Sequence, residues 1–573
     1  MSAAGSKIVN LEDLKVSHDA LNNKIDKLIA DNMLFDGTPE RYRAAMKWWF
    51  LSHAVNVTTP AGLTALCDQW YELTRTGWNG WVEFKQPAVS AVSDGVKGGD
   101  NAGLICVPST DTEANQDDYA GLPLFAVVDC NYTVDANTLE PVITAIEGIS
   151  DSFERSNPSK FVGVLQQAGW HWYDEKAESY IHGYSAEKQE GHDYCAPLPE
   201  AVRASDNTMR PWVVHSKYMS HTEDGKMTCY SGPIPTAYSV SHNSQHTLST
   251  ATGAQYSGSS VIDYAFLQLM AFIKYGRMSL DGILQGCINY NFQYFAQAAE
   301  AGVKRVLLRP TDAANLIVGS GVIIGAYNGE TKDRVNGANY SVTGREGARI
   351  TAIESVNIDG IAYAAVYVDT EETFDTVANG NDTAGTTFIS TFHWHNGSCD
   401  NILGSDGSPD TPGNGRYAAR LQGIEYMVGG YEVMADVILN LYQDVDNYYY
   451  EPNLVNRSAN QATSITANYT ATGLKSLQPA SAQWTYIRKL MFAMGIFFGT
   501  DTTGGSSSTF TRDAFYKNAE TVGTREWLAF GGLGYGSGGG GLFCLGGTGS
   551  LGYANWGILA RLSPNGNRGE WAA

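Results

Sequence analysis

The chain has 573 residues and a formal net charge of −22, with only 17% charged residues but 62 glycines, 32 tyrosines and 13 tryptophans. No run of lysine and arginine stands out, which argues against a protein that binds nucleic-acid phosphates, and the aromatic content is too high for a disordered acidic chain. At roughly 150 residues per domain, the length predicts three to four structural units.

The chain also lacks the usual signals of membranes and secretion. No stretch approaches twenty apolar residues, so we expect no membrane insertion. The opening MSAAGSKIVNLEDLKV has no apolar segment typical of a signal peptide. The eight cysteines are scattered without a Cys-x-x-Cys pair, so we expect them to be reduced and mostly buried in a chain made in a cytoplasm.

The first predicted element is a short coiled coil within residues 1–35. Six residues follow the a/d spacing, with mostly polar residues between them: Leu11, Leu14, His18, Leu21, Ile25 and Leu28. So few heptads are not stable as an isolated helix, which indicates that partner chains share the seam. We expect an oligomerisation and attachment helix, with a homotrimer as the favoured assembly. The alternative is an amphipathic helix packed on the domain that follows.

Residues 36–313 are predicted to form an α+β region, the first part of the body. Helices are expected at 39–54 and 60–76, each opened by a threonine before a proline. A polar loop at 95–121 precedes a buried strand at 122–132 and short strands between 161 and 187. Two further helices are predicted at 261–277 and 280–301, apolar almost all round and therefore central in the core.

Residues 314–414 are predicted to be an inserted β-rich subdomain. Segments rich in β-branched residues alternate with Asn-Gly and Asp-Gly turns as far as about 376, which is typical of a small β-barrel or meander. A loop rich in glycine, aspartate, serine and proline at 396–416 closes it. Residues 421–443 indicate mixed helix and strand, and the chain from 527 onward indicates short strands separated by glycines.

Several motifs that resemble catalytic or metal sites are weak here. Two GxGxxG matches lie in a tract with 12 glycines between 531 and 552, where such matches arise by chance. His393 and His395 share a strand face, but a lone pair of histidines is more often structural than metal-binding. His242 and His246 lie in a segment whose composition indicates a loop. We expect no metal, no cofactor and no catalytic residue.

The C-terminal tract carries a family resemblance. Its order is Trp527, Phe530-Gly-Gly, a small-residue loop, Gly-Leu-Phe543, a second such loop, Ala-Asn-Trp556, and Ala-Arg561-Leu. This order resembles the variable region of diversity-generating retroelement target proteins, including the major tropism determinants of phages. Residues 259–287, 419–441 and the N-terminal segment also resemble tail-associated phage proteins, and the likeness covers about 1–35, 210–318 and 415–573. It implies a C-type-lectin-like fold, with a ligand-binding region at 415–573 and variable loops at 531–557.

A codon argument separates variable from fixed positions. In such systems adenines are randomised, and asparagine codons of the AAY type then give only certain residues. Ten loop positions hold residues reachable in this way, and they are the expected ligand-binding face: Leu533, Tyr535, Ser537, Cys544, Gly546, Gly549, Leu551, Tyr553, Asn555 and Gly557. The interleaved residues are the expected scaffold: Trp527, Phe530, Phe543, Trp556, Arg561 and Trp571. The alternative is a glycine-rich loop that simply needs positive φ angles.

The resemblance implies a phage virion protein, made in the bacterial host cytoplasm and located in the phage tail, as a tail-fibre or tail-tip subunit for host adhesion. Tyrosine with serine, glycine and asparagine is a composition that also serves antibody loops. The expected partners are a host bacterial surface receptor, either protein or glycan, and other virion tail proteins. The alternatives are a structural virion protein without receptor binding (head decoration, collar or baseplate) and a tail-associated glycan hydrolase.

Overall fold

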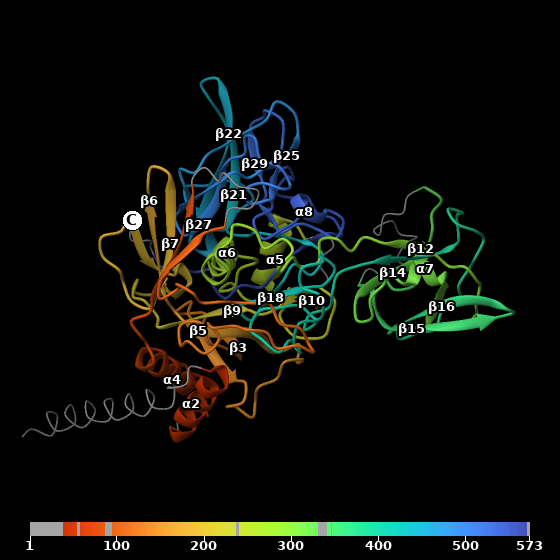
Figure 1. The fold of residues 1–573 in the computed structure, drawn as a ribbon, viewed down its shortest axis with the longest axis horizontal. Coiled ribbons are helices and arrows are strands. Elements are labelled where there is room, and N and C mark those ends of the chain that lie inside the picture. Colours follow the sequence, from red (N-terminus) through yellow and green to blue (C-terminus); the bar gives the residue numbers. More distant parts are fainter. Residues whose placement is uncertain are drawn as a thin grey trace, which may run out of the picture.

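The computed structural model describes residues 38–53, 58–85, 94–235, 240–330, 341–344 and 346–569. Over these ranges the chain is an α+β protein with many short strands and few helices, as Figure 1 shows. The predicted coiled-coil positions, from Leu11 to Leu28, lie outside the described residues. Within the described part, every helix is too short or too polar to cross a lipid bilayer.

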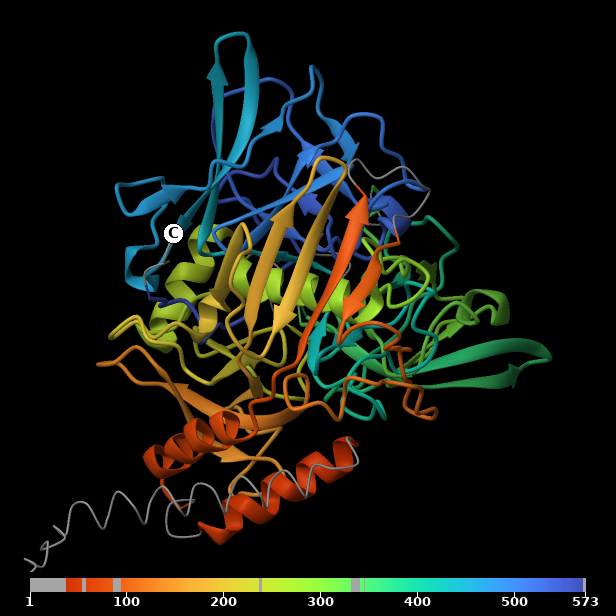
Figure 2. The same cartoon turned by 60° about the vertical axis from the view of Figure 1, so that its left-hand side comes forward.

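Two helices cover one end of the body (Figure 2). They are α2 (Pro39–Ser52) and α4 (Pro60–Leu73), and they confirm the helices predicted at these positions. Each begins at a threonine whose hydroxyl accepts a backbone N–H of the first turn, followed by a proline, which lacks the N–H that a helix start leaves unused. The indole of Trp70 donates to the hydroxyl of Tyr42 at 2.9 Å and joins the two helices.

Two antiparallel sheets follow the helices. One has the order β4-β3-β5-β9 and packs against α4, and the other has the order β2-β1-β7-β6-β8. The strands are β1 (Asn79–Lys85), β2 (Val96–Gly99), β3 (Val127–Val134), β4 (Pro141–Ile146), β5 (Phe161–Gln167), β6 (Trp170–Glu175), β7 (Ser179–Ser185), β8 (Tyr194–Pro197) and β9 (Trp212–Ser216). The strands predicted between 161 and 187 are confirmed, whereas the strand predicted from 122 begins only at Val127.

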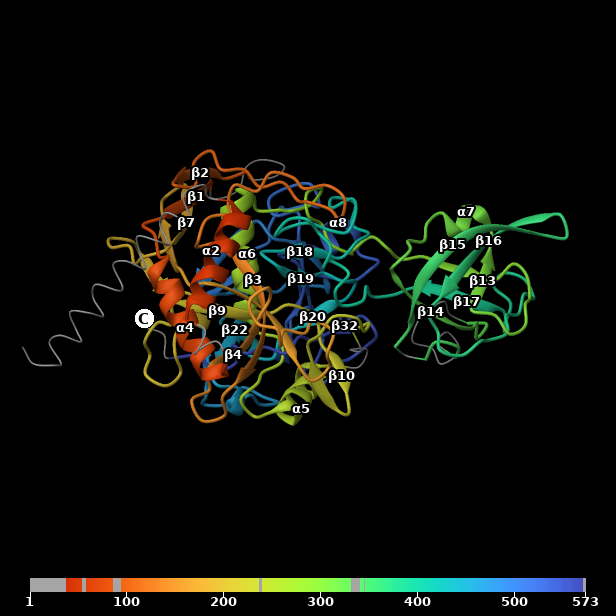
Figure 3. The same ribbon diagram turned by 90° about the horizontal axis from the view of Figure 1, so that it is seen from below.

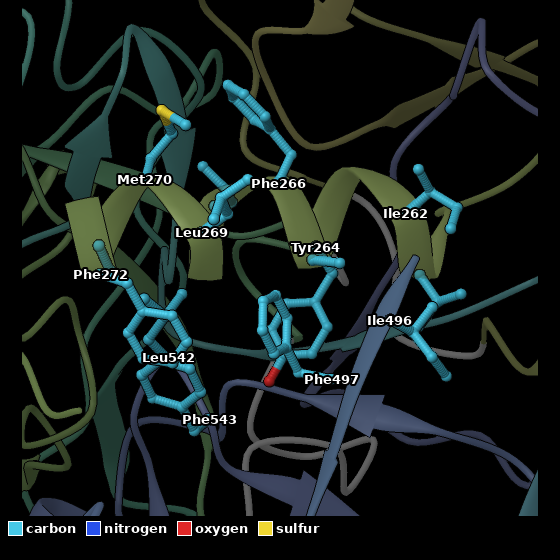
Figure 4. Close-up of a cluster of buried hydrophobic side chains, with 14 of the residues drawn as sticks. Ile262, Tyr264, Phe266, Leu269, Met270, Phe272, Ile496, Phe497, Leu542 and Phe543 are labelled. Carbon is cyan, nitrogen blue, oxygen red and sulfur yellow. The ribbon is translucent and has the colours of Figure 1, made fainter. Parts of the chain in front are cut away.

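Helix α6 (Val261–Tyr275) lies at the centre of the body. Every side chain from Val261 to Lys274 is buried, as the nearly continuous apolar pattern predicts. Figure 4 shows aromatic side chains from other elements meeting it. The ring of Phe272 lies 5.2 Å from that of Phe543 and 5.4 Å from that of Phe497. The helix ends at Gly276, whose φ of +65° is left-handed.

The prediction of a helix at 280–301 is wrong. This segment forms turns followed by the short strand β12 (Gln293–Phe295). Only Ile283 and Leu284 donate to the preceding turn, at Leu280. The donors that follow bond to distant segments: the N–H of Gln285 to Pro412 and that of Cys287 to Met427. Gly286 has a φ of +70°, which a right-handed helix does not allow. Tertiary hydrogen bonds have therefore overridden an apolar pattern.

Two other expectations need correction. The His242–Thr252 segment, expected to be a loop, is helix α5, and it begins with a capping box between Ser241 and Ser244. Residues 421–443 contain strands and turns but no helix. Their backbone groups form hydrogen bonds to neighbouring strands and not within helical turns. Those strands and their partners are β18 (Ala419–Leu421), β19 (Ile424–Tyr426), β20 (Tyr431–Val433) and β21 (Val437–Asp444). The small hairpin β10 (His221–Glu223) and β11 (Lys226–Thr228) lies beside α5.

A separate β module projects from the body, as Figures 1 and 3 show. Its six strands have the order β12-β17-β14-β15-β16-β13 and enclose their own hydrophobic core. Besides β12, the elements are β13 (Arg305–Leu308), α7 (Pro310–Ala313), β14 (Gly321–Ala326), β15 (Ala348–Ile358), β16 (Ile361–Val368) and β17 (Thr387–Thr391). The β-rich insertion is therefore present, but its sheet spans 293–391. The expected bounds of 314–414 miss β12 and β13 and include residues that pack with the body.

The two ends of the β module meet each other. Phe292 donates its N–H to the hydroxyl of Thr391 at 3.0 Å, and Thr391 donates its N–H to the carbonyl of Phe292 at 3.0 Å. We expect a chain in which residues 293–390 are replaced by a short Gly-Ser linker to keep the body folded, with an unfolding temperature within several degrees of the parent. Circular dichroism and thermal unfolding measure this.

Removing the hairpin of residues 489–501 provides the control. Phe492 and Phe497 of that hairpin belong to the main core, so its loss should unfold the body. A body that unfolds equally after either deletion would contradict the independence of the β module.

The C-terminal strands complete the body in two sheets and a hairpin. One sheet has the order β25-β28-β31-β30-β20-β32, and the other has β23-β22-β21-β29 with β24 on β22. The remaining strands are β22 (Asn447–Val455), β23 (Tyr469–Ala471), β24 (Ser476–Leu477), β25 (Gln483–Tyr486), β26 (Lys489–Ala493), β27 (Ile496–Asp501), β28 (Ala514–Lys517), β29 (Gly523–Arg525), β30 (Leu528–Ala529), β31 (Leu545–Gly546) and β32 (Ile558–Leu559). The short strands expected from 527 onward are confirmed. None of the eight cysteines, all of which lie in the described ranges, forms a disulfide, and six are buried, as expected.

Candidate functional site

The ten positions expected to bind a ligand are divided between surface and core. Five are buried: Leu533, Cys544, Gly546, Leu551 and Gly557. Two are well exposed, Tyr535 at 48% and Tyr553 at 46%. Gly549 and Asn555 are half-buried. Ser537 lies in the single-turn helix α8 (Gly536–Gly539), and its side chain is outside the described part.

The buried positions correct the expected binding face. Leu533 is fully buried in a core that α2 and α4 also line, and its backbone pairs with Tyr290 and Gly429. Leu551 packs with Ile438 and other residues of a small separate cluster. Cys544 is buried beside α8, where its thiol reaches the carbonyl of Gly539 at 3.2 Å. Codon reachability says which residue can occur at a position, whereas burial follows from where that residue points.

The expected scaffold residues lie mainly in the core. Trp527, Phe530, Phe543 and Arg561 are at most 3% exposed, and Trp556 is half-buried. The Phe530 ring packs edge-on to Tyr264 of α6 at 5.1 Å. Arg561 forms a buried ion pair with Glu432 at 3.2 Å. Trp571 lies outside the described residues.

An aromatic face surrounds the two exposed tyrosines. We use this name for Tyr431, Trp484, Tyr516, Tyr535 and Tyr553. The Tyr535 ring lies 5.4 Å from that of Tyr431 and 5.6 Å from that of Trp484, which in turn lies 4.8 Å from Tyr516. Burial raises the pKa of the Tyr535 hydroxyl, a hydrogen bond with Tyr431 lowers it, and the neighbouring Tyr553 raises it further. Four of these rings are therefore linked by successive contacts, and Tyr553 lies close enough to Tyr535 to affect its pKa.

The sheet order explains why these residues meet. Trp484 on β25 and Tyr516 on β28 are paired across adjacent strands, and Tyr431 lies on β20 of the same sheet. Tyr535 directly precedes α8, which packs against β28 of this sheet. The sequence reasoning missed Tyr431, Trp484 and Tyr516 because they lie far from the glycine-rich tract along the chain. Only the strand order brings them together.

Glycines make room for the Tyr535 ring. A Cβ at Gly539 would lie 3.1 Å from the Cβ of Tyr535, and one at Gly532 would lie 3.4 Å from its ring. The loop then turns at Gly536, whose φ is +58°. The glycine-rich composition thus supports close packing beneath an exposed aromatic ring as well as a tight turn.

A buried carboxylic acid lies beneath the second exposed tyrosine. The side chain of Glu526 is fully buried, and neither carboxyl oxygen has a side-chain hydrogen-bond partner within the described ranges. Burial raises its pKa to about 8, an effect that the backbone N–H of His242 only partly offsets. A Cβ at Gly549 would lie 2.4 Å from a Glu526 oxygen and 2.9 Å from the Tyr553 ring. Any other residue at 549 would therefore displace both neighbours.

Asn555 holds the Tyr553 side of the face. Its amide donates to the Tyr553 hydroxyl at 2.7 Å, and its carbonyl oxygen accepts the N–H of Gly557 at 2.7 Å. The loop is thus fixed by local hydrogen bonds while the Tyr553 ring stays exposed. Such a surface offers rigid apolar area together with polar groups, a combination suited to binding.

The candidate histidine motifs have structural partners. His393 contacts the carbonyl of Trp556 at 2.8 Å, and His395 contacts that of Gly319 at 3.1 Å. Burial lowers the pKa of His395 to about 4, so this imidazole is neutral near pH 7. Across the described residues, no three His, Cys, Asp or Glu side chains are grouped to hold a metal ion.

Comparisons with known proteins do not identify a family for this chain. No protein family model matches the chain, and no curated protein matches it.

Proposed function

We propose that the chain is a receptor-binding subunit of a phage tail fibre or tail tip, with the aromatic face as its host-binding surface. The main observation in support is that Tyr535 and Tyr553 are well exposed and that three further aromatic rings lie near them. Exposed, fixed aromatic rings supply large contact area at low entropic cost. The role proposed is binding rather than catalysis.

The C-terminal region 415–573 is proposed to be C-type-lectin-like. The family resemblance supports this, as does the way β32 returns from the chain end to pair in parallel with β20. The proposed site would be a variable surface confined to Tyr535, Tyr553, Asn555 and their aromatic neighbours. A homotrimer joined through residues 1–35 would present several copies, and such multivalency raises apparent affinity by about 10²–10⁴-fold.

Replacing both exposed tyrosines tests the proposal. We expect the double variant Tyr535→Ala/Tyr553→Ala to adsorb to host cells at least about tenfold more weakly, because exposed aromatic anchors commonly carry most of a binding energy. The measurement is adsorption of particles carrying the variant. Tyr448→Ala is the matched control, since Tyr448 lies on the separate β21–β22 hairpin and is half-buried. Equal adsorption by parent and double variant would refute the receptor-binding role.

The alternative is a structural virion protein that does not bind the receptor. Thiol labelling of intact particles distinguishes the two roles. Tyr535→Cys introduces a thiol at an exposed position, whereas six of the native cysteines are buried. A maleimide reagent should label this variant well above the parent in intact particles if the face points outward. Labelling only after particle disassembly would favour a head decoration, collar or baseplate role, with the face packed between subunits.

A further inference from the structure

A charged cavity of about 470 Å³ lies at the other end of the body, between α2 and the β3 sheet. Figures 1 and 3 show α2 beside β3, remote from α8. Five cationic side chains line the cavity, namely Arg43, Lys47, Arg155, Lys217 and Arg420, against three carboxylates, Asp129, Glu147 and Asp400. The lining therefore carries an excess of two positive charges in a chain whose net charge is −22.

The carboxylates of the cavity are already paired. Lys217 contacts Asp129 at 2.5 Å and Asp400 at 3.2 Å. Arg155 bridges Asp129 and Glu147, with 2.6 Å to each. Although burial acts to raise the pKa of Asp129, Lys217 and Arg155 hold it below its usual value, so this carboxylate stays charged. The negative charges of the lining are thus compensated from within the protein.

Three cations of the cavity form no ion pair with a described carboxylate, although Arg420 lies near enough to Asp129, and Arg43 to Glu147, to act to lower the pKa of those carboxyls. Arg420 is 7% exposed, and its guanidinium donates only to the backbone carbonyls of Cys399, Ile402 and Gly404. Its Nε has no hydrogen-bond partner within the described part of the chain. Arg43 and Lys47 lie on the exposed side of α2 and form no ion pair with any described residue. A buried cation without a carboxylate is costly unless an anion approaches it.

We propose that this cavity binds an acidic monosaccharide unit, with the cations holding its carboxylate and Glu147 accepting its hydroxyls. Arginine and lysine favour carboxylate ligands, and the remaining lone pairs of Glu147 suit hydroxyl donors, whereas Asp400 already accepts from Tyr218 and Ser231. The volume lies within the range of small-ligand sites. This site is independent of the aromatic face, and either can fail without the other.

Binding of defined probes tests the proposal. Isothermal titration of the full chain at physiological salt uses galacturonate, with galactose and inorganic phosphate as comparison probes. We expect galacturonate to bind at least about tenfold more tightly than either, because only it offers both a carboxylate and hydroxyls. Phosphate binding as tight as that of galacturonate would assign a simple anion site and overturn the saccharide, and no galacturonate binding would overturn the whole proposal.

Variants on α2 locate the binding without touching the core. Arg43→Gln/Lys47→Gln should weaken galacturonate binding roughly three- to tenfold, and Ala44→Trp should block the mouth of the cavity and abolish it. Arg41→Gln is the matched control, since Arg41 is exposed on the same helix but does not line the cavity. Equal affinity in all four proteins would place the sugar elsewhere and refute the site.

Discussion

Lys274→Met is expected to destabilise the body by about 3–5 kcal/mol, because it removes the cation from a buried ion pair and leaves carboxylates unpaired. Lys274 lies on α6, and its ammonium, fully buried, contacts Asp406 at 2.9 Å and Asp117 at 3.2 Å. Burial acts to lower the pKa of Lys274, but the two carboxylates raise it above its usual value, so the residue is charged at neutral pH. Urea unfolding followed by tryptophan fluorescence measures the loss.

A neighbouring exposed pair gives the control for Lys274. Arg277 contacts Asp94 at 2.7 Å, with the Arg277 side chain 32% exposed and that of Asp94 67% exposed, so Arg277→Gln should cost less than about 1 kcal/mol. Adding Asp406→Asn to Lys274→Met should restore part of the stability, since one of the two unpaired charges is then neutral. If Lys274→Met and Arg277→Gln cost the same, Lys274 does not act as a buried counterion.

Glu526→Gln is expected to remove a fall in stability that the parent shows between about pH 5 and pH 8. In the folded chain Glu526 keeps its proton up to about pH 8, whereas an unfolded chain releases it near pH 4.3. Between these values the folded state binds more protons, so the free energy of unfolding decreases as pH rises, by up to about 1.4 kcal/mol per pH unit for this group. Glutamine has no such proton to lose.

The measurement is a series of urea unfolding curves from pH 5 to pH 9 for parent and variant. The difference between them should grow in favour of Glu526→Gln as pH rises and level off above pH 8. Glu371→Gln, at an exposed position of the β module, should follow the parent at every pH. Parallel profiles for the parent and Glu526→Gln would show that Glu526 is ionised in the folded chain.

Elements with strong local signals were predictable from the sequence. The helices near 39–54 and 60–76 carry a threonine cap and a proline start, and the helix near 261–277 is apolar on every side. By contrast, the composition around Ser241 and Ser244 indicates a loop, although these two serines form the capping box of a helix. After Leu280, backbone N–H groups of an apolar segment donate to carbonyls far away along the chain. Local patterns do not contain those tertiary partners.

The candidate site was predictable only in part. Tyr535 and Tyr553 were expected at the surface and lie there, but Leu533 and Cys544 of the same tract are buried. Whether a residue of this tract is exposed or buried depends on which side chains point toward the core at each short strand. The glycine-rich sequence pattern does not specify that direction. Trp484 and Tyr431 join the face through the strand order, which no local window specifies.

The closeness of Gly549 to Glu526 has a practical consequence for any engineered repertoire built on this chain. Random substitution at 549, or at the buried Leu533 and Cys544, would produce mostly misfolded variants, and few members of such a library could be tested for binding. Randomising only 535, 553 and 555 would instead vary the chemistry of the surface and leave the core intact. The packing around Gly549 therefore determines which positions can be varied without loss of the fold.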